Sequence, residues 1–288
     1  MKVGFAGLGI MGVPMAANLI NAGFTLGVYN RTARRCEPLT AQGAAAYPTP
    51  SALAAESDVV ITIVSDTSDV ESVLFGENGL AAGLKPGSAV IDMSTISPTK
   101  TVEFSKKLGD QQVSMLDAPV SGGDKGAIAG TLSIMVGGDQ ATFDRCRPLF
   151  DAMGKNIVYT GPSGNGQKTK LVNQVVGSLN LLAMVEGLRM AEHAGLDPQK
   201  TLDAVGAGAA GSWMWSNLGP RVAQRDFAPG FMVRLHQKDL RLAAEFAGDL
   251  GIDLPGTALT HGTFTKALDQ GLGDEGNQGI YKLWEKGA

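Results

Sequence analysis

The most informative stretch of the chain lies at residues 2–29 and reads KVGFAGLGIMGVPMAANLINAGFTLGVY. A short apolar run ends directly in Gly7-Leu8-Gly9-Ile10-Met11-Gly12, helical spacing follows from Pro14, and a second apolar run occupies Thr25–Tyr29. In such a unit the first glycine permits a tight turn, the second lets a pyrophosphate approach the backbone, and the third lets the helix pack closely on the strand. The N–H groups at the helix start would bind the phosphates. The stretch predicts a βαβ dinucleotide site, with a purely structural glycine turn as the alternative.

The pattern continues through the first 160 residues. Further apolar or β-branched runs recur at Val59–Val64, Ala89–Met93, Val113–Asp117, Leu132–Val136 and Ile157–Tyr159, and most are separated by stretches with helical spacing. Strands that alternate with helices predict a parallel sheet covered on both faces, which explains why several strands are almost continuously apolar. We therefore expect a doubly wound α/β domain of the Rossmann type over residues 1–163.

The pattern changes after Gly164. Residues 166–193 contain no proline and no β-type run, so they predict one long helix, and Gly195 supplies a helix stop. Further helical segments follow at about 198–206, 234–249 and 257–270. We therefore expect a second, all-helical domain over residues 164–288, joined to the first by the long helix and serving substrate binding and oligomerisation.

Composition excludes several classes of protein. Glycine and proline together make 52 of the 288 residues, about 18%, which is below the level of disordered chains. A net charge of −4 without a basic cluster argues against nucleic-acid or anionic-membrane binding. The isolated cysteines Cys36 and Cys146 form no zinc or disulfide pattern, and none of the three histidines has a second ligand at metal spacing. Since residues 1–12 also read poorly as a signal peptide, we expect a cytoplasmic protein without a metal site.

Polar residues after the predicted strands are candidate cofactor ligands. Residue 30, where NAD-specific folds carry a carboxylate for the adenine ribose, is Asn30, and Arg31, Thr32 and Arg35 follow it. Asparagine does not repel a 2′-phosphate and arginine can bind one, so NADP(H) is favoured over NAD(H). The alternative is a solvated basic turn. Two further strand ends, Val64-Ser65-Asp66 and the segment that ends in Thr95, are equally compatible with ligand binding and with helix capping.

Candidate substrate residues occur in two places. Ser121, Gly122 and Gly123 open a loop whose hydroxyl and N–H groups suit an anion, although an ordinary glycine turn is as compatible. On the long helix, Lys170, Asn173, Gln174, Gly177 and Asn180 form a narrow polar stripe among apolar residues. That stripe is either a solvated helix face or the wall of a cleft in which Lys170 protonates a carbonyl oxygen while a hydride reaches the carbon.

Six segments together resemble the β-hydroxyacid dehydrogenases, which include 3-hydroxyisobutyrate dehydrogenase, tartronate semialdehyde reductase and the glyoxylate/succinic semialdehyde reductases. They read GFAGLGIMGVPMAANL at 4–19, IDMSTISP at 91–98, DAPVSGG at 117–123, GTLSIMVGG at 130–138, GNGQKTKLVNQ at 164–174 and FMVRLHQKDLRLA at 231–243. The resemblance implies that Thr95 lies near the nicotinamide ribose and that Lys238, placed with help from Asp239, lies over the cofactor. It also implies that Ser121 and its glycines bind the substrate carboxylate and that Lys170 is the general acid or base.

The chain departs from the family pattern at one position of the long helix. Many members carry asparagine four residues after the lysine, where it would orient substrate, whereas this chain has Gln174 there and Asn173 before it. That order is similar to tartronate semialdehyde reductases, while Asn30-Arg31-Thr32 resembles the NADP-using glyoxylate/succinic semialdehyde branch. The roles of Trp213 and Trp215 stay open.

The sequence therefore predicts an NADPH-dependent reductase of small aldehyde acids, in the form of a homodimer or homotetramer. The alternatives are a tartronate semialdehyde reductase, a 3-hydroxyisobutyrate dehydrogenase, or a non-catalytic NADP(H)-binding module. The candidate cofactor residues are Gly7, Leu8, Gly9, Ile10, Met11, Gly12, Asn30, Arg31, Thr32, Arg35, Val64, Ser65, Asp66, Thr95 and Lys238; the candidate substrate residues are Ser121, Gly122, Gly123, Lys170, Asn173 and Gln174.

Overall fold

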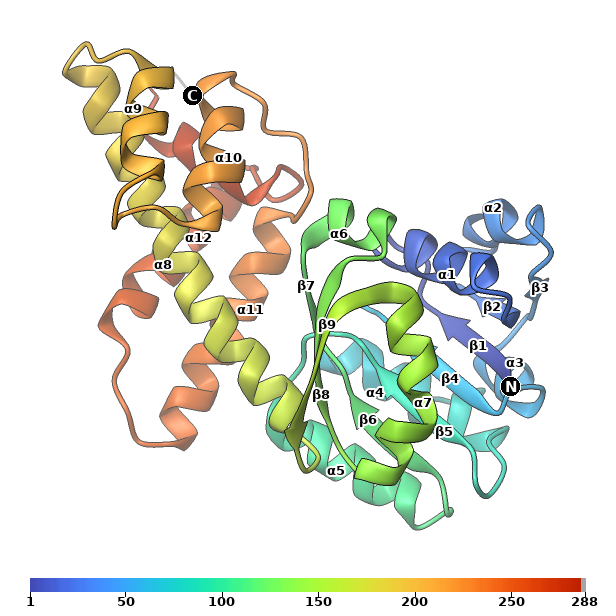
Figure 1. The fold of residues 1–288 in the computed structure, drawn as a ribbon. Coiled ribbons are helices and arrows are strands. Elements are labelled where there is room, and N and C mark those ends of the chain that lie inside the picture. The colour runs from blue at the N-terminus through green and yellow to red at the C-terminus, as the bar shows by residue number, and fades with distance from the viewer. Residues whose placement is uncertain (286–288) are drawn as a thin grey trace. The chain divides into compact units, whose positions relative to one another are not determined.

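The computed structural model describes residues 1–285, which form two compact units (Figure 1). The first unit, Met1–Lys170, contains the sheet, and the second, from Leu171 onward, is helical. The division falls inside the long helix, after Lys170. The predicted fold class, a Rossmann-type doubly wound sheet followed by an all-helical part with a long helix linking them, is confirmed.

A nine-stranded sheet organises the first unit. The strands run in the order β3-β2-β1-β4-β5-β6-β8-β7, with β9 also paired to β8. The part from β3 to β6 is parallel, β8 is antiparallel to β6 and β7, and β9 is parallel to β8. Strand order reverses at β1, the position at which open α/β sheets bind ligands. The bounds are β1 Lys2–Ala6, β2 Thr25–Tyr29, β3 Ala45–Ala46, β4 Val59–Thr62, β5 Ala89–Asp92, β6 Ser114–Asp117, β7 Val120–Ser121, β8 Leu132–Gly137 and β9 Gly154–Gly161.

Four helices of the first unit, α3, α4, α5 and α7, begin at a side-chain cap. Thr49, Asp66, Ser97 and Asp139 each accept a hydrogen bond from a backbone N–H of the helix that they precede, which satisfies a donor that the helix leaves unpaired. The bounds are α1 Gly12–Asn21, η1 Ala33–Cys36, α2 Glu37–Thr40, α3 Pro50–Ala55, α4 Thr67–Phe75, η2 Leu80–Ala82, α5 Pro98–Gly109, α6 Gly123–Ala129 and α7 Gln140–Met153.

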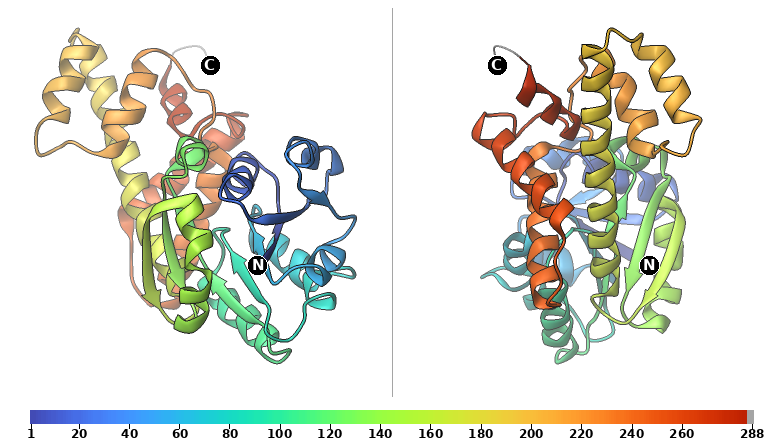
Figure 2. Two further views of the ribbon diagram at one scale, coloured as in Figure 1. Left: turned by 45° about the vertical axis from the view of Figure 1, so that its right-hand side comes forward. Right: turned by 90° about the vertical axis from the view of Figure 1, so that its left-hand side faces the viewer.

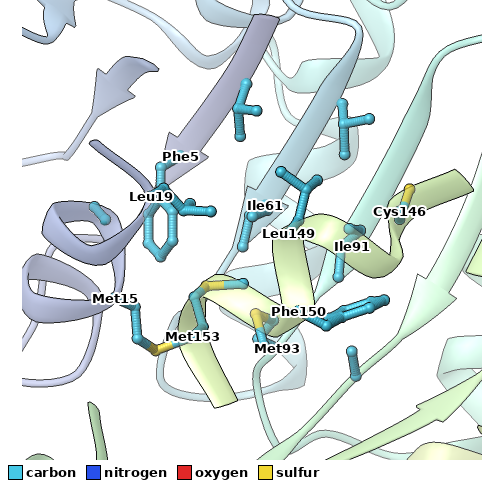
Figure 3. Close-up of a cluster of buried hydrophobic side chains, with 14 of the residues drawn as sticks. Phe5, Met15, Leu19, Ile61, Ile91, Met93, Cys146, Leu149, Phe150 and Met153 are labelled. Carbon is cyan, nitrogen blue, oxygen red and sulfur yellow. The ribbon is translucent and has the colours of Figure 1, made fainter. Parts of the chain in front are cut away.

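The core of the first unit lies in two layers because strand side chains alternate between the faces of the sheet. Phe5, Ile61 and Ile91 belong to the layer that includes Met15 of α1 and Phe150 of α7 (Figure 3). The intervening strand residues, including Val60 and Val90, belong to a second layer with side chains of α3, α4 and α5. Both faces are therefore covered, as the nearly continuous apolar strands predict.

The second unit is built around α8, which spans Asn165–His193 and begins in the first unit. Leu181, Met184, Val185 and Leu188 of α8 share one core with residues of the other helices. Those elements are α9 Pro198–Gly206, α10 Trp213–Ala223, α11 Val233–Asp249, α12 Pro255–Asp269 and η3 Asn277–Trp284. Figure 2 shows the ribbons of the second unit from two further sides.

Helix α10 is absent from the sequence prediction because Gly219 and Pro220 lie near its end and read as helix breakers. Trp215 anchors this helix: its side chain is buried in the core, and its Nε1–H donates to the carbonyl of Leu202 at 3.0 Å. Trp213, in contrast, is 58% exposed. The two tryptophans therefore differ in role, and Trp215 packs the core.

Within residues 1–285, α8 is the one helix long and apolar enough to cross a membrane by length and composition. In its most apolar window 44% of the residues are buried inside the protein. The core helix of a soluble protein satisfies the same criterion, and we assign no membrane span to α8.

Candidate functional site

The glycine loop between β1 and α1 gives each of its three glycines a separate role. Gly7 has φ +104°, a conformation that favours glycine, and a Cβ built on it would lie 2.2 Å from the Ile63 carbonyl oxygen. A Cβ on Gly12 would lie 1.9 Å from the Gly7 carbonyl oxygen. Among the described residues, a Cβ on Gly9 would meet no atom within 4 Å apart from its own chain neighbours. Packing thus explains Gly7 and Gly12 but not Gly9, which is the glycine that faces the pyrophosphate in a dinucleotide loop.

The start of α1 fits the same ligand. Its N-cap residue is Met11, and no side chain caps the first turn. Helix N-termini favour anions because their N–H groups and the helix dipole point toward the ligand. The loop and helix together therefore have the form of a phosphate cradle.

The turn after β2 joins the glycine loop to a basic surface. Asn30 Oδ1 accepts a hydrogen bond from the Leu8 N–H at 2.9 Å, and its Nδ2 donates to the Thr32 carbonyl at 3.0 Å. The amide of Asn30 thereby holds two backbone segments together. Arg31 and Arg35 are exposed, and the side chain of Arg31, 92% exposed, lies 4.0 Å from Asp69 at the start of α4. The guanidinium groups of Arg31 and Arg35 are therefore accessible to solvent beside the glycine loop.

A buried carboxylate connects the ends of β4 and β5. Asp92 Oδ1 accepts hydrogen bonds from the hydroxyls of Thr62 at 2.8 Å and Ser94 at 2.7 Å. The Ser94 Oγ in turn accepts from the N–H of Val64 at 2.9 Å. This network fixes the backbone that leads to Ser65 and to Thr95. Ser65 is exposed, and Thr95 is partly exposed.

The side chain of Asp66, a candidate cofactor residue, accepts from the Thr67 N–H at 2.7 Å and caps α4. Asp66 therefore acts as a helix cap, and its assignment to the cofactor stays a prediction.

A second buried carboxylate holds the start of α8. Asp117 is the register partner of Asp92 on the neighbouring strand. Its Oδ1 accepts from the Gly164 N–H at 2.8 Å, and its Oδ2 accepts from the Gln167 N–H at 2.9 Å. Burial raises the pKa of Asp117 to about 6, against the lowering effect of these hydrogen bonds. Lys170, which is 6% exposed, follows Gln167 by one turn of the same helix.

The loop at Ser121-Gly122-Gly123 lies at the end of β7. Ser121 is half-buried, and Gly122 and Gly123 have φ values of +137° and +62°. Gly122 is the N-cap residue of α6, which begins at Gly123. Both glycines are thus required by the backbone conformation, which turns the chain from β7 into α6.

A hydrogen-bonded chain of side chains lies within the second unit. Asn173 Nδ2 donates to Gln174 Oε1 at 2.8 Å, and Gln174 Nε2 donates to Asp239 Oδ2 at 2.6 Å. The other oxygen of Asp239 lies 2.7 Å from Lys238 Nζ, and both side chains of this ion pair are nearly buried. Gln174 therefore contacts Asp239, which in turn holds Lys238.

The polar stripe on α8 is less open than its sequence indicates. A Cβ built on Gly177 would lie 3.3 Å from the Cε of Met214. The space that this glycine leaves is therefore occupied in part by a methionine.

The candidate residues fall into two groups. Register pairing brings Ala6, Thr62, Asp92 and Asp117 to one edge of the parallel sheet, so the loops that follow these strands share that edge. The first unit contains Lys170 and the segments 7–12, 30–35, 64–66, 95 and 121–123. The second unit contains Asn173, Gln174, Lys238 and Asp239.

Sequence reasoning missed three residues that position this edge, namely Asp92, Asp117 and Gln167. A buried carboxylate at the end of an apolar strand was the available signal for the two aspartates, because such a group needs donors from elsewhere in the chain.

Comparisons with known proteins agree with the fold and the loop. Residues 2–161 match the family model described as the NAD binding domain of 6-phosphogluconate dehydrogenase. Residues 164–284 match the model described as NAD-binding of NADP-dependent 3-hydroxyisobutyrate dehydrogenase.

Individual relatives extend over nearly the whole chain. The 2-hydroxy-3-oxopropionate reductase of Escherichia coli is 44% identical over 271 residues, covering 94% of this chain and 92% of that protein. The NAD-dependent L-serine dehydrogenase of Pseudomonas aeruginosa is 34% identical, covering 99% and 98%. The crystal structure of 3-hydroxyisobutyrate dehydrogenase from Salmonella typhimurium superimposes with a TM-score of 0.90 at 32% identity, covering 99% and 100%. The chain belongs to the β-hydroxyacid dehydrogenase family of oxidoreductases.

Proposed function

We propose that this protein is an NADPH-dependent reductase of small aldehyde acids, such as glyoxylate or succinic semialdehyde, with Lys170 as the general acid. The observation that carries the proposal is the position of Lys170, on a helix whose first turn is bonded to the same sheet edge as the glycine loop. A nicotinamide cofactor, when bound, supplies the hydride for the aldehyde carbon. Lys170 gives a proton to the carbonyl oxygen, so the aldehyde acid becomes a hydroxy acid.

The choice of NADPH rests on the turn after β2. Residue 30 is an asparagine whose amide is bonded to the loop backbone, so no carboxylate repels a 2′-phosphate. Arg31, Thr32 and Arg35 are exposed beside it and offer charge and a hydroxyl group. A preference for NADH would contradict this part of the proposal.

Substrate binding is assigned to Ser121 and the glycines after it. The hydroxyl and the nearby backbone N–H groups would bind the carboxylate and thereby orient the aldehyde carbon. Reduction of 2-hydroxy-3-oxopropionate, which is tartronate semialdehyde, is a second candidate, supported by the 44% identical relative and by the order Asn173-Gln174. Oxidation of 3-hydroxyisobutyrate is a third, supported by the similar crystal structure.

The experiment is a steady-state survey of NADPH oxidation with glyoxylate, succinic semialdehyde, tartronate semialdehyde and methylmalonate semialdehyde, for the wild type and Lys170→Met. The expected result is one preferred aldehyde acid and a kcat that falls by at least about 100-fold in the variant, since general acid catalysis contributes ~10²–10⁴. Wild-type kcat in Lys170→Met would refute the catalytic assignment. NADPH binding without turnover of any short aldehyde acid by the wild type would favour a non-catalytic binding module.

We also propose a homodimer formed through α8. Val172, Val176 and Leu179 lie at intervals of four and three residues on this helix and are 64%, 54% and 37% exposed. Leu259 of α12 is 63% exposed. Apolar side chains that recur on one helix face favour a protein partner. Sedimentation of Val176→Asp should show a shift toward the monomer, and a wild type that is monomeric at micromolar concentration would exclude the proposal.

A further inference from the structure

Gln167 joins the start of α8 to the loop after β5. Its side chain is fully buried, and its Nε2 donates to the Ser94 carbonyl at 2.8 Å while its Oε1 accepts from the Ile96 N–H at 3.1 Å. The amide therefore pairs with backbone groups on both sides of Thr95. A neutral amide presents a donor and an acceptor side by side, and this accounts for glutamine at the position.

The backbone of Gln167 is held as firmly as its side chain. Its N–H donates to one oxygen of Asp117, and the Gly164 N–H donates to the other. A Cβ on Gly166 would lie 2.4 Å from the Asp117 carbonyl oxygen and 2.5 Å from that of Met135, so the helix start approaches the strands without an intervening side chain. The first turn of α8 is therefore bonded to the ends of both β5 and β6.

Lys170 follows Gln167 by three residues, so their side chains are neighbours on one helix face. The lysine begins about 4.5 Å further along the helix axis, at ~1.5 Å per residue. Both residues belong to the first unit, as does Thr95. A rotation or shift of this helical turn would move the lysine ammonium relative to the loop that carries Thr95.

From these contacts we propose that Gln167 is a positioning residue for the proposed proton donor. It fixes the helical turn that carries Lys170 to the backbone on both sides of Thr95. The distance between the lysine and the loop that carries Thr95 therefore stays constant. The inference rests on the proposed function, because it assigns Lys170 to proton transfer. A displacement of the donor by about 1 Å lowers the rate by ~100-fold when proton transfer depends on the pre-set geometry.

The test uses Gln167→Met, which keeps the length of the side chain and removes both hydrogen bonds. The matched control is Thr169→Val, because Thr169 donates its hydroxyl to the Asn165 carbonyl in the same helical turn but does not hold the loop at 94–96. Gln167→Met should lower kcat by about 10- to 100-fold, raise the solvent deuterium isotope effect, and change the Kd for NADPH by less than about threefold. Thr169→Val should keep kcat within about twofold.

A double-mutant cycle separates positioning from a merely structural role. If Gln167 acts through Lys170, Gln167→Met should lower kcat further by less than about twofold in the Lys170→Met background. Equal losses in both backgrounds, or a wild-type kcat and isotope effect in Gln167→Met, would overturn the inference while leaving Lys170 catalytic. Wild-type kcat in Lys170→Met would instead remove the proposed function.

A second variant covers the case in which Gln167→Met does not fold. The ionised carboxylate of Gln167→Glu cannot donate to the Ser94 carbonyl, whereas the protonated acid can. Its kcat relative to the wild type should therefore rise as the pH is lowered, by at least about tenfold across the titration of the new carboxyl. A ratio to the wild type that is independent of pH would contradict the positioning role.

Discussion

Replacing Gly9 and Gly12 by alanine, one at a time, separates ligand binding from folding at the glycine loop. A Cβ at residue 12 would lie 1.9 Å from the Gly7 carbonyl oxygen, so the loop or α1 must move by about 1 Å to reach even a close contact of ~3 Å. Overpacking of this kind costs about 1–3 kcal/mol. At roughly 2–4 °C per kcal/mol for a chain of this size, Gly12→Ala should lower Tm by on the order of 5 °C.

Gly9→Ala should behave in the opposite way. Its Cβ meets nothing within 4 Å, and its φ lies outside the range that favours glycine, so stability should stay within about 1 kcal/mol of the wild type and can even rise. A methyl group at the point of closest approach to the pyrophosphate should weaken NADPH binding by about 10- to 100-fold, or ~1.4–2.8 kcal/mol.

The assay pairs Tm of the ligand-free protein with NADPH Kd from a fluorescence titration. Gly109→Ala is the matched control, because a Cβ there also meets nothing within 4 Å and the residue lies at the far end of α5. Gly109→Ala should leave the free energies of unfolding and of NADPH binding within about 1 kcal/mol of the wild type. Wild-type NADPH affinity in Gly9→Ala would refute the dinucleotide assignment of the loop. If Gly9→Ala lowered Tm as much as Gly12→Ala does, the steric difference between the two glycines would be refuted.

Three further predictions concern ionised side chains. Burial raises the pKa of Asp117 from 3.8 to about 6, so the unfolded chain loses this proton first as pH rises from 4 to 6. The contribution of this carboxyl to the free energy of unfolding should therefore fall by roughly 3 kcal/mol over this window. Calorimetry should show that the difference in unfolding free energy between the wild type and Asp117→Asn varies across the window and is constant above it. Arg31→Ala should raise KM for NADPH by about tenfold and leave KM for NADH unchanged, since its side chain is 92% exposed and available to a phosphate; equal changes for both cofactors would contradict its role. Asp239→Asn should destabilise the protein by about 3–5 kcal/mol in denaturant unfolding because Lys238 would lose the carboxylate 2.7 Å away, and the double variant with Lys238→Met should recover part of that loss; no recovery would argue against the ion pair as the cause.

The sequence was sufficient for the fold class and for the loop because both depend on local signals. Three glycines between an apolar run and a helical period define a strand, a turn and a helix within about 20 residues. The same local reasoning predicted α8 from the absence of breakers. It failed for α10, where Gly219 and Pro220 read as breakers although the buried Trp215 holds the helix through packing and a hydrogen bond.

The positioning contacts could not be read from the sequence because their partners are distant along the chain. Asp117 and Gln167 are 50 residues apart, and Gln167 and Ser94 are 73 apart. No periodicity encodes such pairs, since they exist only after the sheet has brought the strand ends together. Asn30 is an intermediate case. Its position after β2 identifies it as a candidate cofactor residue, but no sequence pattern predicts the hydrogen bond that it accepts from the Leu8 N–H.

The bonding of α8 to the sheet has a consequence for dissecting this protein into autonomous fragments. A fragment that stops at residue 163 would expose Asp117 at the sheet edge and remove both N–H donors that bind its carboxylate. Deprived of those donors, the carboxyl group would have to take up a proton or draw in water at the edge of the core. The shortest self-sufficient nucleotide-binding fragment should therefore extend through the first turns of α8, to Lys170, and carry a helical stub as part of its own domain.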